Sequence, residues 1–198
     1  DVHWNNEPLA SVRLSRAGIY TPLPSPLGDS FPANTRPEDR MWQGFGARAR
    51  VLIVNTTLVK DAERPRSILD LTRGRWSAWA AIAKPFFGTT ATHAAALSAV
   101  LGAEKTRDFF AELKANKVNV VAGNKQVARG VADGQFAVGI TDTDDAIIEL
   151  RAGKPVAIVF PDADGFGTLY LPNTVAIVKG GPSTANAQKL VEFLLRPE

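Results

Sequence analysis

Short apolar runs alternate with helix-like segments from residue 50 onward, and this alternation constrains the fold more than any other feature of the chain. The β-branched run from Arg50 to Asn55 predicts a buried strand. After it the patterns predict strands over residues 80–83, 118–121, 136–140 and 156–160, and helices over 91–101, 104–116, 125–133 and 144–152. This order indicates an α/β fold in which helices flank a mixed, largely parallel sheet.

Glycines and prolines mark the limits of several predicted elements. The helices over 125–133 and 144–152 are expected to end at Gly134 and Gly153. Prolines between residues 21 and 40 predict an irregular surface segment. The remaining predicted elements are a strand over 1–4, a helix over 9–16 that stops at Gly18, an extended pair over 168–178 broken at Pro172, and a helix over 184–195 with Ser183 as its N-cap.

The composition argues against several classes of protein. Lys and Arg number 23 against 20 for Asp and Glu, and the charges are spread along the chain, so nucleic-acid binding is not expected. The absence of cysteine excludes disulfides and thiolate metal sites. No apolar run approaches the roughly 18 to 20 residues that span a bilayer, and no export signal opens the chain. The chain starts at Asp1 without a methionine and directly in a strand-like pattern, and it ends at Glu198 just after an apolar helix pattern, so both ends are expected to be cut from a longer protein.

The loop between residues 84 and 91, which joins a predicted strand to a predicted helix, is the most informative segment. Gly88 lets the backbone approach a ligand, and the unpaired N–H groups at a helix start favour an anion. Thr89 and Thr90 fit two roles, either as caps of the helix or as further donors to that anion. The loop is therefore a candidate oxyanion-binding site.

Acidic residues follow another predicted strand. Ligands of open α/β sheets lie outside the carboxyl ends of strands, so Thr141, Asp142 and Thr143 are candidates to hold a cation or an amine. The alternative is that Thr143 caps the next helix and that Asp144 and Asp145 occupy its first turn, where carboxylates complement the helix dipole. We assign Asp145 to the helix start.

Polar residues at other strand boundaries are weaker candidates. Asn124 follows a predicted strand, where it can cap a helix and also donate to a ligand. Arg48 precedes the long apolar strand, and its guanidinium suits either a bidentate grip on an anionic ligand or a surface ion pair. The two histidines, His3 and His93, form no recognisable metal motif, and His93 is expected to be structural. No nucleophile elbow, Walker loop or dinucleotide fingerprint is present, so catalysis is not expected.

Four segments resemble, in their order and spacing, the family 1 extracellular solute-binding proteins of ABC importers, specifically their ferric-iron-binding branch: residues 1–7, 42–54, 87–93 and 139–146. The resemblance covers essentially the whole chain. It implies a type II periplasmic-binding-protein fold, in which crossing strands join two α/β lobes, with the first lobe incomplete. The implied division is 1–55 for part of lobe 1 with the first crossing strand, 56–170 for lobe 2, and 171–198 for the return strand and helix of lobe 1.

The resemblance and the residue patterns together define an expected ligand site. Its ligand-binding residues are Glu7, Arg48, Gly88, Thr89, Thr90, Asn124, Thr141, Asp142 and Thr143. The expected metal ligands are Glu7, Asp142 and Asp144. Many members of this branch carry adjacent tyrosines as ferric ligands, but this chain has Thr143 and Asp144 there, and its two tyrosines, Tyr20 and Tyr170, lie elsewhere.

The expected function is the capture of iron(III), or of another cation, with a bridging anion. The alternatives are binding of a phosphonate, a polyamine or another small organic solute and, in a different class, a two-lobed transferase or hydrolase that uses Asp142, Asp144 and His93. A third hypothesis is a remnant that binds nothing. The resemblance also implies an ABC permease in the membrane as partner, a periplasmic or other extracytoplasmic location, and a monomer at full length.

Overall fold

The computed structural model describes residues 1–23 and 25–196, so the irregular segment predicted at Pro24 and the chain end at Pro197 and Glu198 lie outside the described residues. The chain forms two compact units, which we name the terminal unit (Asp1–Arg48 with Leu171–Glu198) and the central unit (Ala49–Tyr170). Strand β3 (Gln43–Asn55) contributes residues to both units. Strand β8 (Tyr170–Val178) begins at the last residue of the central unit.

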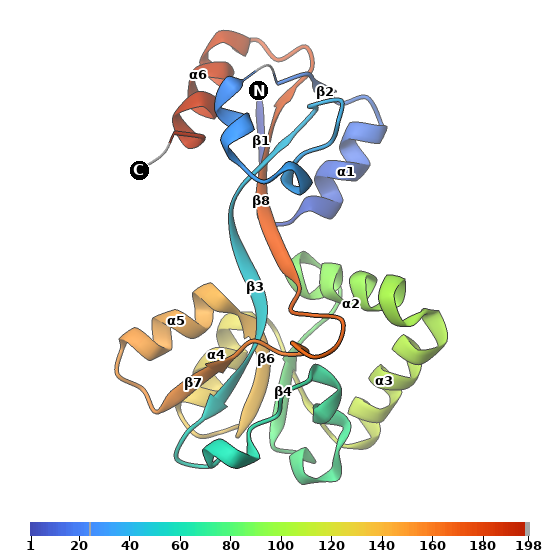
Figure 1. Ribbon diagram of the computed structural model, residues 1–198, viewed down its shortest axis with the longest axis vertical. Coiled ribbons are helices and arrows are strands. Elements are labelled where there is room, and N and C mark those ends of the chain that lie inside the picture. The colour runs from blue at the N-terminus through green and yellow to red at the C-terminus, as the bar shows by residue number, and fades with distance from the viewer. Residues whose placement is uncertain (24, 197–198) are drawn as a thin grey trace. The chain divides into compact units, whose positions relative to one another are not determined.

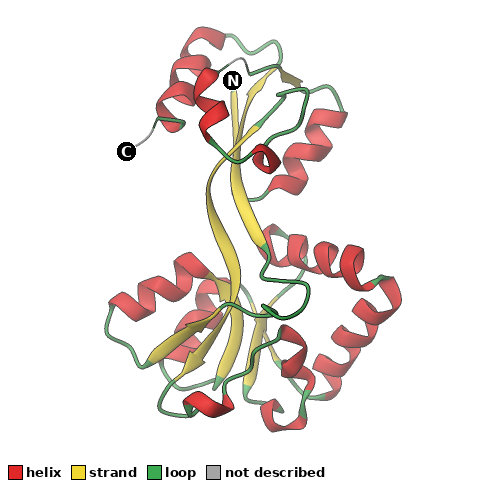
Figure 2. Cartoon of the chain, viewed as in Figure 1, coloured by secondary structure: helices red, strands yellow, loops and turns green. Residues whose placement is uncertain are grey.

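The strands follow the order β1-β8-β3-β6-β4-β5, with β2 beside β8 and β7 beside β3 (Figures 1 and 2). The other strands are β1 (Val2–Asn5), β2 (Tyr20–Thr21), β4 (Ala80–Ala83), β5 (Asn119–Val121), β6 (Val138–Asp142) and β7 (Val156–Val159). Strand β4 is parallel to β5 and β6, whereas β3 is antiparallel to β6 and β7, and β8 is antiparallel to β1 and β2. The predicted mixed sheet is confirmed. The expectation that it is largely parallel is wrong, because β3 is antiparallel to β6 and β7, and β8 is antiparallel to β1 and β2.

Each predicted helix is present in the described residues. The α-helices are α1 (Pro8–Arg16), α2 (Gly88–Leu101), α3 (Ala103–Ala115), α4 (Asn124–Ala132), α5 (Thr143–Arg151) and α6 (Thr184–Leu194). Single 3-10 turns cover Pro26–Ser30, Ala33–Thr35, Asp61–Glu63, Ile68–Thr72 and Gly74–Trp76. Gly18, Gly134 and Gly153 adopt positive φ just after α1, α4 and α5, as expected for glycines that end helices. None of the helices in residues 1–23 and 25–196 combines the length and apolarity of a membrane span.

Most boundaries agree with the prediction to within two residues, and the largest difference is at β3, which starts at Gln43, seven residues before the predicted start. Helix α2 starts at Gly88, three residues before the predicted start. Strand β6 starts at Val138 because Phe136 still belongs to the turn after α4, where its N–H donates to the carbonyl of Gly130. Strand β8 continues through Pro172, since the fixed φ of proline is compatible with extended backbone.

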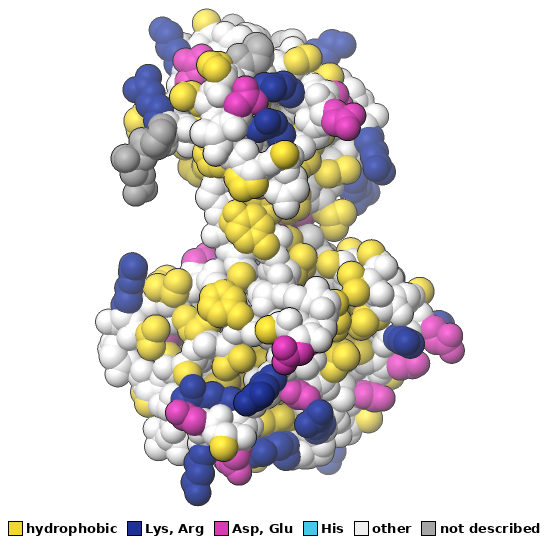
Figure 3. Space-filling model, in the orientation of Figure 1, with side chains coloured by type: hydrophobic (Ala, Val, Ile, Leu, Met, Phe, Trp, Pro, Cys, Tyr) yellow, Lys and Arg dark blue, Asp and Glu magenta, His cyan; other side chains and the backbone are white. Residues whose placement is uncertain are grey.

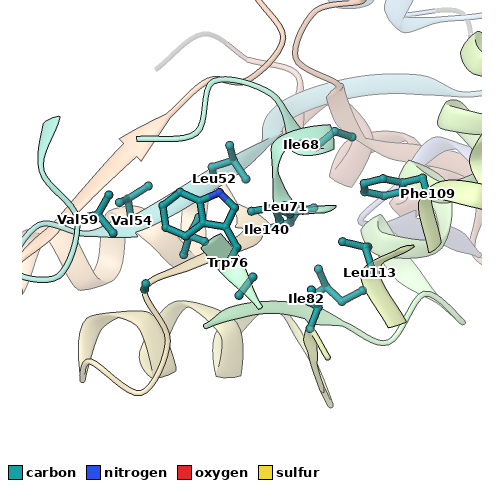
Figure 4. Close-up of a cluster of buried hydrophobic side chains, with 14 of the residues drawn as sticks. Leu52, Val54, Val59, Ile68, Leu71, Trp76, Ile82, Phe109, Leu113 and Ile140 are labelled. Carbon is teal, nitrogen blue, oxygen red and sulfur yellow. The ribbon is translucent and has the colours of Figure 1, made fainter. Parts of the chain in front are cut away.

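Strand β3 is covered on both faces in the central unit. Leu52 and Val54 point to one face and Val51 and Ile53 to the other, and all four side chains are fully buried. The first face packs against α2, α3 and the turns near residues 68–76, and Figure 4 shows this cluster around Trp76. The second face packs against α4 and α5. The central unit is therefore a three-layer α/β/α arrangement whose rigid sheet holds the strand ends in place.

The terminal unit uses the same alternation along β8. Val175 and Ile177 pack against α6, and Ala176 lies on the opposite face with Tyr20 and Trp42. Ser183 occupies the predicted N-cap position of α6, but its side chain makes no capping hydrogen bond. On the face shown in Figure 3, basic and acidic side chains are interspersed, in keeping with their spread along the sequence.

Candidate functional site

Three helices of the central unit begin at one edge of its sheet. Strands β4, β5 and β6 are parallel, and each is followed by a loop or a direct turn into a helix, namely α2, α4 and α5. Their helix N-termini therefore lie at the carboxyl ends of these strands, where α/β proteins bind ligands. The first residues of these helices include Thr89, Asn124 and Thr143, and the last residue of β6 is Asp142.

The threonines at the start of α2 do not cap the helix, and their ligand-binding role stays a prediction. The N-cap residue is Phe87, and no side chain within the described residues caps the helix, so the prediction that Thr89 or Thr90 is the cap is wrong. Gly88 has a φ of +60°, a conformation that strains any other residue, although the space around it is open. Glycine is thus favoured here by the backbone turn that precedes the helix.

The two threonines bond across the sheet edge instead. Thr89 Oγ1 donates to Asp142 Oδ2 at 2.6 Å and accepts from Asn124 Nδ2 at 2.9 Å. Thr90 Oγ1 donates to Asn124 Oδ1 at 3.2 Å. Asn124 is the first residue of α4 and Gly123 is the N-cap, so the predicted capping role of Asn124 is also wrong. These contacts between residues far apart in sequence replace the local caps.

Arg50 lies at the centre of this network and is 1% exposed. Its Nη1 donates to Asp142 Oδ1 at 2.6 Å, to Asn124 Oδ1 at 3.0 Å and, weakly, to Thr89 Oγ1 at 3.4 Å. A buried guanidinium is costly unless it is paired and hydrogen-bonded, and here the carboxylate of Asp142 compensates it. One residue of β3 therefore ties together the ends of β6 and the starts of α2 and α4.

Both carboxylate oxygens of Asp142 already have partners within the protein. Oδ1 accepts from Arg50, and Oδ2 accepts from Thr89 and, at 2.9 Å, from Asn124. The residue is 3% exposed. An ionised carboxylate has about four lone-pair sites, so these three bonds leave little capacity for a metal ion. The geometry makes Asp142 the counter-ion of Arg50.

Carboxylates on α5 border the network. Single carboxylate oxygens of Asp142, Asp144 and Asp145 lie within 4.8 Å of one another. Asp144 is exposed and Asp145 is partly exposed, so they face solvent more than Asp142 does. Hard cations prefer carboxylate oxygens. The sequence pattern assigns Asp145 only to the helix start. In the structure its carboxylate lies close enough to that of Asp144 for both to contact one cation.

The neighbouring threonines hold the backbone of this edge. Thr143 is the first residue of α5, and its Oγ1 accepts from the N–H of Ala49 at 3.1 Å, so it ties α5 to β3 instead of capping the helix. Thr141 Oγ1 donates to the backbone carbonyl of Asn124 at 3.0 Å. Both contacts position the strand ends relative to the helix starts.

His93 packs under the network as a neutral acceptor. Arg50 Nε donates to His93 Nδ1 at 3.3 Å. Burial, with a smaller effect from the positive charge of Arg50, lowers the pKa of His93 to about 3. The prediction that His93 is structural agrees with this environment.

Stability is expected to fall at acid pH because of His93. An unfolded histidine takes up a proton below its ordinary pKa of 6.5, whereas buried His93 stays neutral down to about pH 3. Protonation therefore stabilises the unfolded state relative to the native state as the pH falls from 6.5 to about 3. Between pH 7 and pH 4.5, the wild type should lose roughly 2 to 3 kcal/mol more unfolding free energy than His93→Gln, which retains an acceptor for Arg50. Urea unfolding at the two pH values measures this. Equal losses in the two proteins would show that His93 is protonated in the native state.

Two of the expected site residues belong to the terminal unit. Glu7 is the N-cap of α1, and its carboxylate accepts from the N–H groups of Leu9 and Ala10 at 2.7 and 3.1 Å. Arg48 Nη2 donates to Asn173 Oδ1 at 2.9 Å. Each therefore has a structural role in its own unit, and a ligand-binding role stays a prediction for both.

The network includes residues that the sequence reading missed or placed elsewhere. The sequence pattern predicts Arg50 only as the start of a strand, and Asp145 only as a helix-start residue. The sequence signal available for Arg50 is a charge adjoining the four apolar residues Val51 to Val54, because a charged residue at the edge of a buried strand needs a partner. That signal does not identify the partner.

Comparison with known proteins places the chain among binding proteins. A family model described as bacterial extracellular solute-binding protein matches residues 10–198. The Fe(3+)-binding periplasmic protein of Serratia marcescens is 32% identical over 143 residues, which cover 71% of this chain and 41% of that protein. Iron uptake protein A1 of Synechocystis sp. is 28% identical over 197 residues, which cover 93% of this chain and 54% of that protein. The chain thus spans about half the length of these curated relatives.

A solved structure extends the comparison to the backbone. Iron-bound HitA from Pseudomonas aeruginosa matches with a TM-score of 0.90 and 22% identity, over 99% of this chain and 64% of HitA. At this identity the likeness concerns the fold.

Proposed function

The chain belongs to the family of bacterial extracellular solute-binding proteins, and from that premise we propose that it is part of the ligand-capturing component of an ABC importer. Proteins of this family bind small ligands and work with ABC permeases. The family and the α/β fold class predicted from the sequence are confirmed, and a family of binding proteins agrees with the prediction that the chain is not an enzyme. The ligand, the permease contact, the extracytoplasmic location and the monomeric state of the whole protein all belong to this proposal.

The observation that carries the proposal is the convergence of three helix starts on one polar network. Thr89, Asn124 and Asp142 are held by Arg50 in hydrogen bonds of 2.6 to 3.4 Å, so the edge of the sheet is organised before any ligand arrives. Preorganisation lowers the entropic cost of binding. The helix N–H groups at this edge favour an anion, and the carboxylates of Asp144 and Asp145 favour a cation.

The solute class that fits both features is a hard cation bound together with a small oxyanion. Asp144 and Asp145 would ligate the cation, and the starts of α2 and α4 would hold the anion. Iron(III) is the first candidate for the cation, since a 32% identical relative is named as an Fe(3+)-binding periplasmic protein. Asp142 contributes to this site indirectly, as the counter-ion that keeps Arg50 and the amide of Asn124 in position.

An organic zwitterion is the second candidate, because the same edge offers groups for both charges. An amine would pair with Asp144 and Asp145, and a phosphonate would occupy the helix starts. A polyamine would use the acidic residues alone.

The transferase or hydrolase alternative has weaker support: His93, with a pKa of about 3 and its Nδ1 occupied, is poorly suited to general acid or base catalysis near neutral pH.

Isothermal titration calorimetry of the intact protein separates these candidates. The panel is ferric ion with citrate or phosphate, 2-aminoethylphosphonate, and spermidine. Saturable heat with a ferric salt and its anion supports the first candidate, and heat with the organic compounds alone supports the second. Silence toward the whole panel contradicts the proposed site.

A ferric complex of this protein is expected to be essentially colourless. Phenolate ligands give ferric proteins a visible charge-transfer band, and carboxylates do not. Thr143 and Asp144 stand where relatives are expected to carry tyrosines, and the hydroxyl of Tyr20 is bonded to His3 Nδ1 at 2.6 Å. The visible spectrum of the iron-loaded protein tests this. A strong band that disappears in Tyr20→Phe or Tyr170→Phe would refute carboxylate coordination.

A further inference from the structure

A cavity in the central unit lies beside α2, and none of Asp142, Asp144 and Asp145 lines it. Its volume is about 140 Å³. Leu97, Val100 and His93 of α2 form one side, and residues 166–170 form the other. An engineered apolar cavity of similar size, about 150 Å³, binds benzene. The volume and the apolar walls therefore suit a single ring or a short branched chain.

His93 supplies one polar group of this cavity; Thr168, whose hydroxyl donates to the carbonyl of Pro161 at 2.7 Å, and Tyr170 also line it. Arginine has no acceptor atom, so the contact from Arg50 Nε requires Nδ1 of His93 to accept. A neutral imidazole carries one N–H, so the proton of His93 is on Nε2. No hydrogen bond of Nε2 to another protein group is found in the described parts of the chain.

The position of the His93 ring determines the direction in which its Nε2–H points. His93 lines both this cavity and a smaller chamber of about 20 Å³, which it shares with Arg50. Arg50 lines the smaller chamber, and its Nε donates to Nδ1 of His93. The bonding directions of the two ring nitrogens diverge, so Nε2–H is directed away from Arg50, and the larger cavity is the other one that His93 lines.

We propose that this cavity binds a small monocyclic molecule that carries a hydrogen-bond acceptor, and that His93 Nε2–H donates to that acceptor. The apolar body of the ligand contacts Leu97 and Val100. The residues that form the opposite wall are the last five of the central unit. This site is independent of the proposed transport function, because it uses none of the groups assigned to the cation or its anion.

A pair of nearly isosteric probes tests the donor. Acetophenone carries a carbonyl oxygen where α-methylstyrene carries a CH₂ group. Both are titrated into the intact protein, and binding is followed by NMR shifts of the His93 ring nitrogens and of the Val100 methyl groups. Acetophenone is expected to bind roughly two- to tenfold more tightly, which is the usual net effect of one neutral hydrogen bond. The spectrum of the unliganded protein should show the proton of His93 on Nε2.

Matched variants locate the binding. Val100 and Val120 are 60% and 54% exposed, and only Val100 lines the cavity. Val100→Phe should fill the cavity and abolish the acetophenone response, whereas Val120→Phe should leave it unchanged. The proposal is overturned if the two probes bind equally, if neither shifts His93, if the proton is on Nδ1, or if Val100→Phe binds like the wild type. The probe comparison needs no variant and so holds even if Val100→Phe fails to fold.

Discussion

Replacing Arg50 by methionine is expected to lower the free energy of unfolding by about 3 to 5 kcal/mol. The change leaves Asp142 as a buried carboxylate with its charge uncompensated, since the guanidinium at 2.6 Å is its ion-pair partner. It also removes the donor that bonds to Asn124 and His93. Urea unfolding at pH 7 measures the loss. The matched control is Arg129→Met, because Arg129 is exposed and pairs with Glu149 only at 4.0 Å; it should cost less than about 1 kcal/mol.

The double variant Arg50→Met with Asp142→Leu separates the ion pair from the packing around it. Removing both charges avoids the uncompensated carboxylate, so the double variant should be more stable than Arg50→Met alone. Strict additivity of the two single changes would show that Arg50 and Asp142 are not coupled. A loss below 1 kcal/mol in Arg50→Met would contradict the buried network altogether.

Changing Asp144 and Asp145 together to asparagine is expected to weaken ferric binding on the order of 100-fold or more. Loss of a residue that merely supports a metal ligand commonly costs 10- to 100-fold, and the loss of both carboxylates that we propose as ligands should exceed that. Stability should change little, because Asp144 is exposed and Asp145 partly exposed. Competition titration against a chelator measures the affinity.

A control variant with the same loss of charge distinguishes direct ligation of the cation from long-range electrostatic attraction. Asp108→Asn with Glu112→Gln removes two exposed carboxylates from α3 and should change ferric affinity less than about threefold at physiological salt. If both double variants weaken binding equally, the acidic residues act only through long-range attraction. Unchanged affinity in the Asp144 and Asp145 variant would contradict their role as cation ligands and leave both as solvated carboxylates at a helix start.

Local patterns were sufficient to predict most elements of the fold. The continuous apolar run from Val51 to Val54 predicts a strand buried on both faces, and Gly134 and Gly153 mark helix ends by a backbone conformation that glycine adopts readily. Strand direction was not accessible in this way. Nothing in the residues of β3 shows that it pairs antiparallel with β6 and β7, because that pairing depends on residues 84 to 107 positions downstream.

The candidate site was predicted only in part for the same reason. Its edge was located because residues after strands β4, β5 and β6 are polar, but the partners within it were not. Arg50 bonds to Thr89, Asn124 and Asp142, which are 39, 74 and 92 positions away in the sequence. A threonine near a helix start predicts an N-cap. Only the fold shows that Thr89 bonds instead to the carboxylate of Asp142, which is far away in the sequence.

Native mass spectrometry of the freshly purified intact protein tests the central claim most directly, because a captured solute is weighed without prior choice of a ligand. The account predicts a protein whose mass exceeds that of its polypeptide by a small ligand, with the excess matching a cation and a small oxyanion, and a loss of that excess in the Asp144→Asn, Asp145→Asn variant. The bare polypeptide mass both as purified and after incubation with ferric citrate, ferric phosphate, 2-aminoethylphosphonate and spermidine would contradict a solute-binding role for this site.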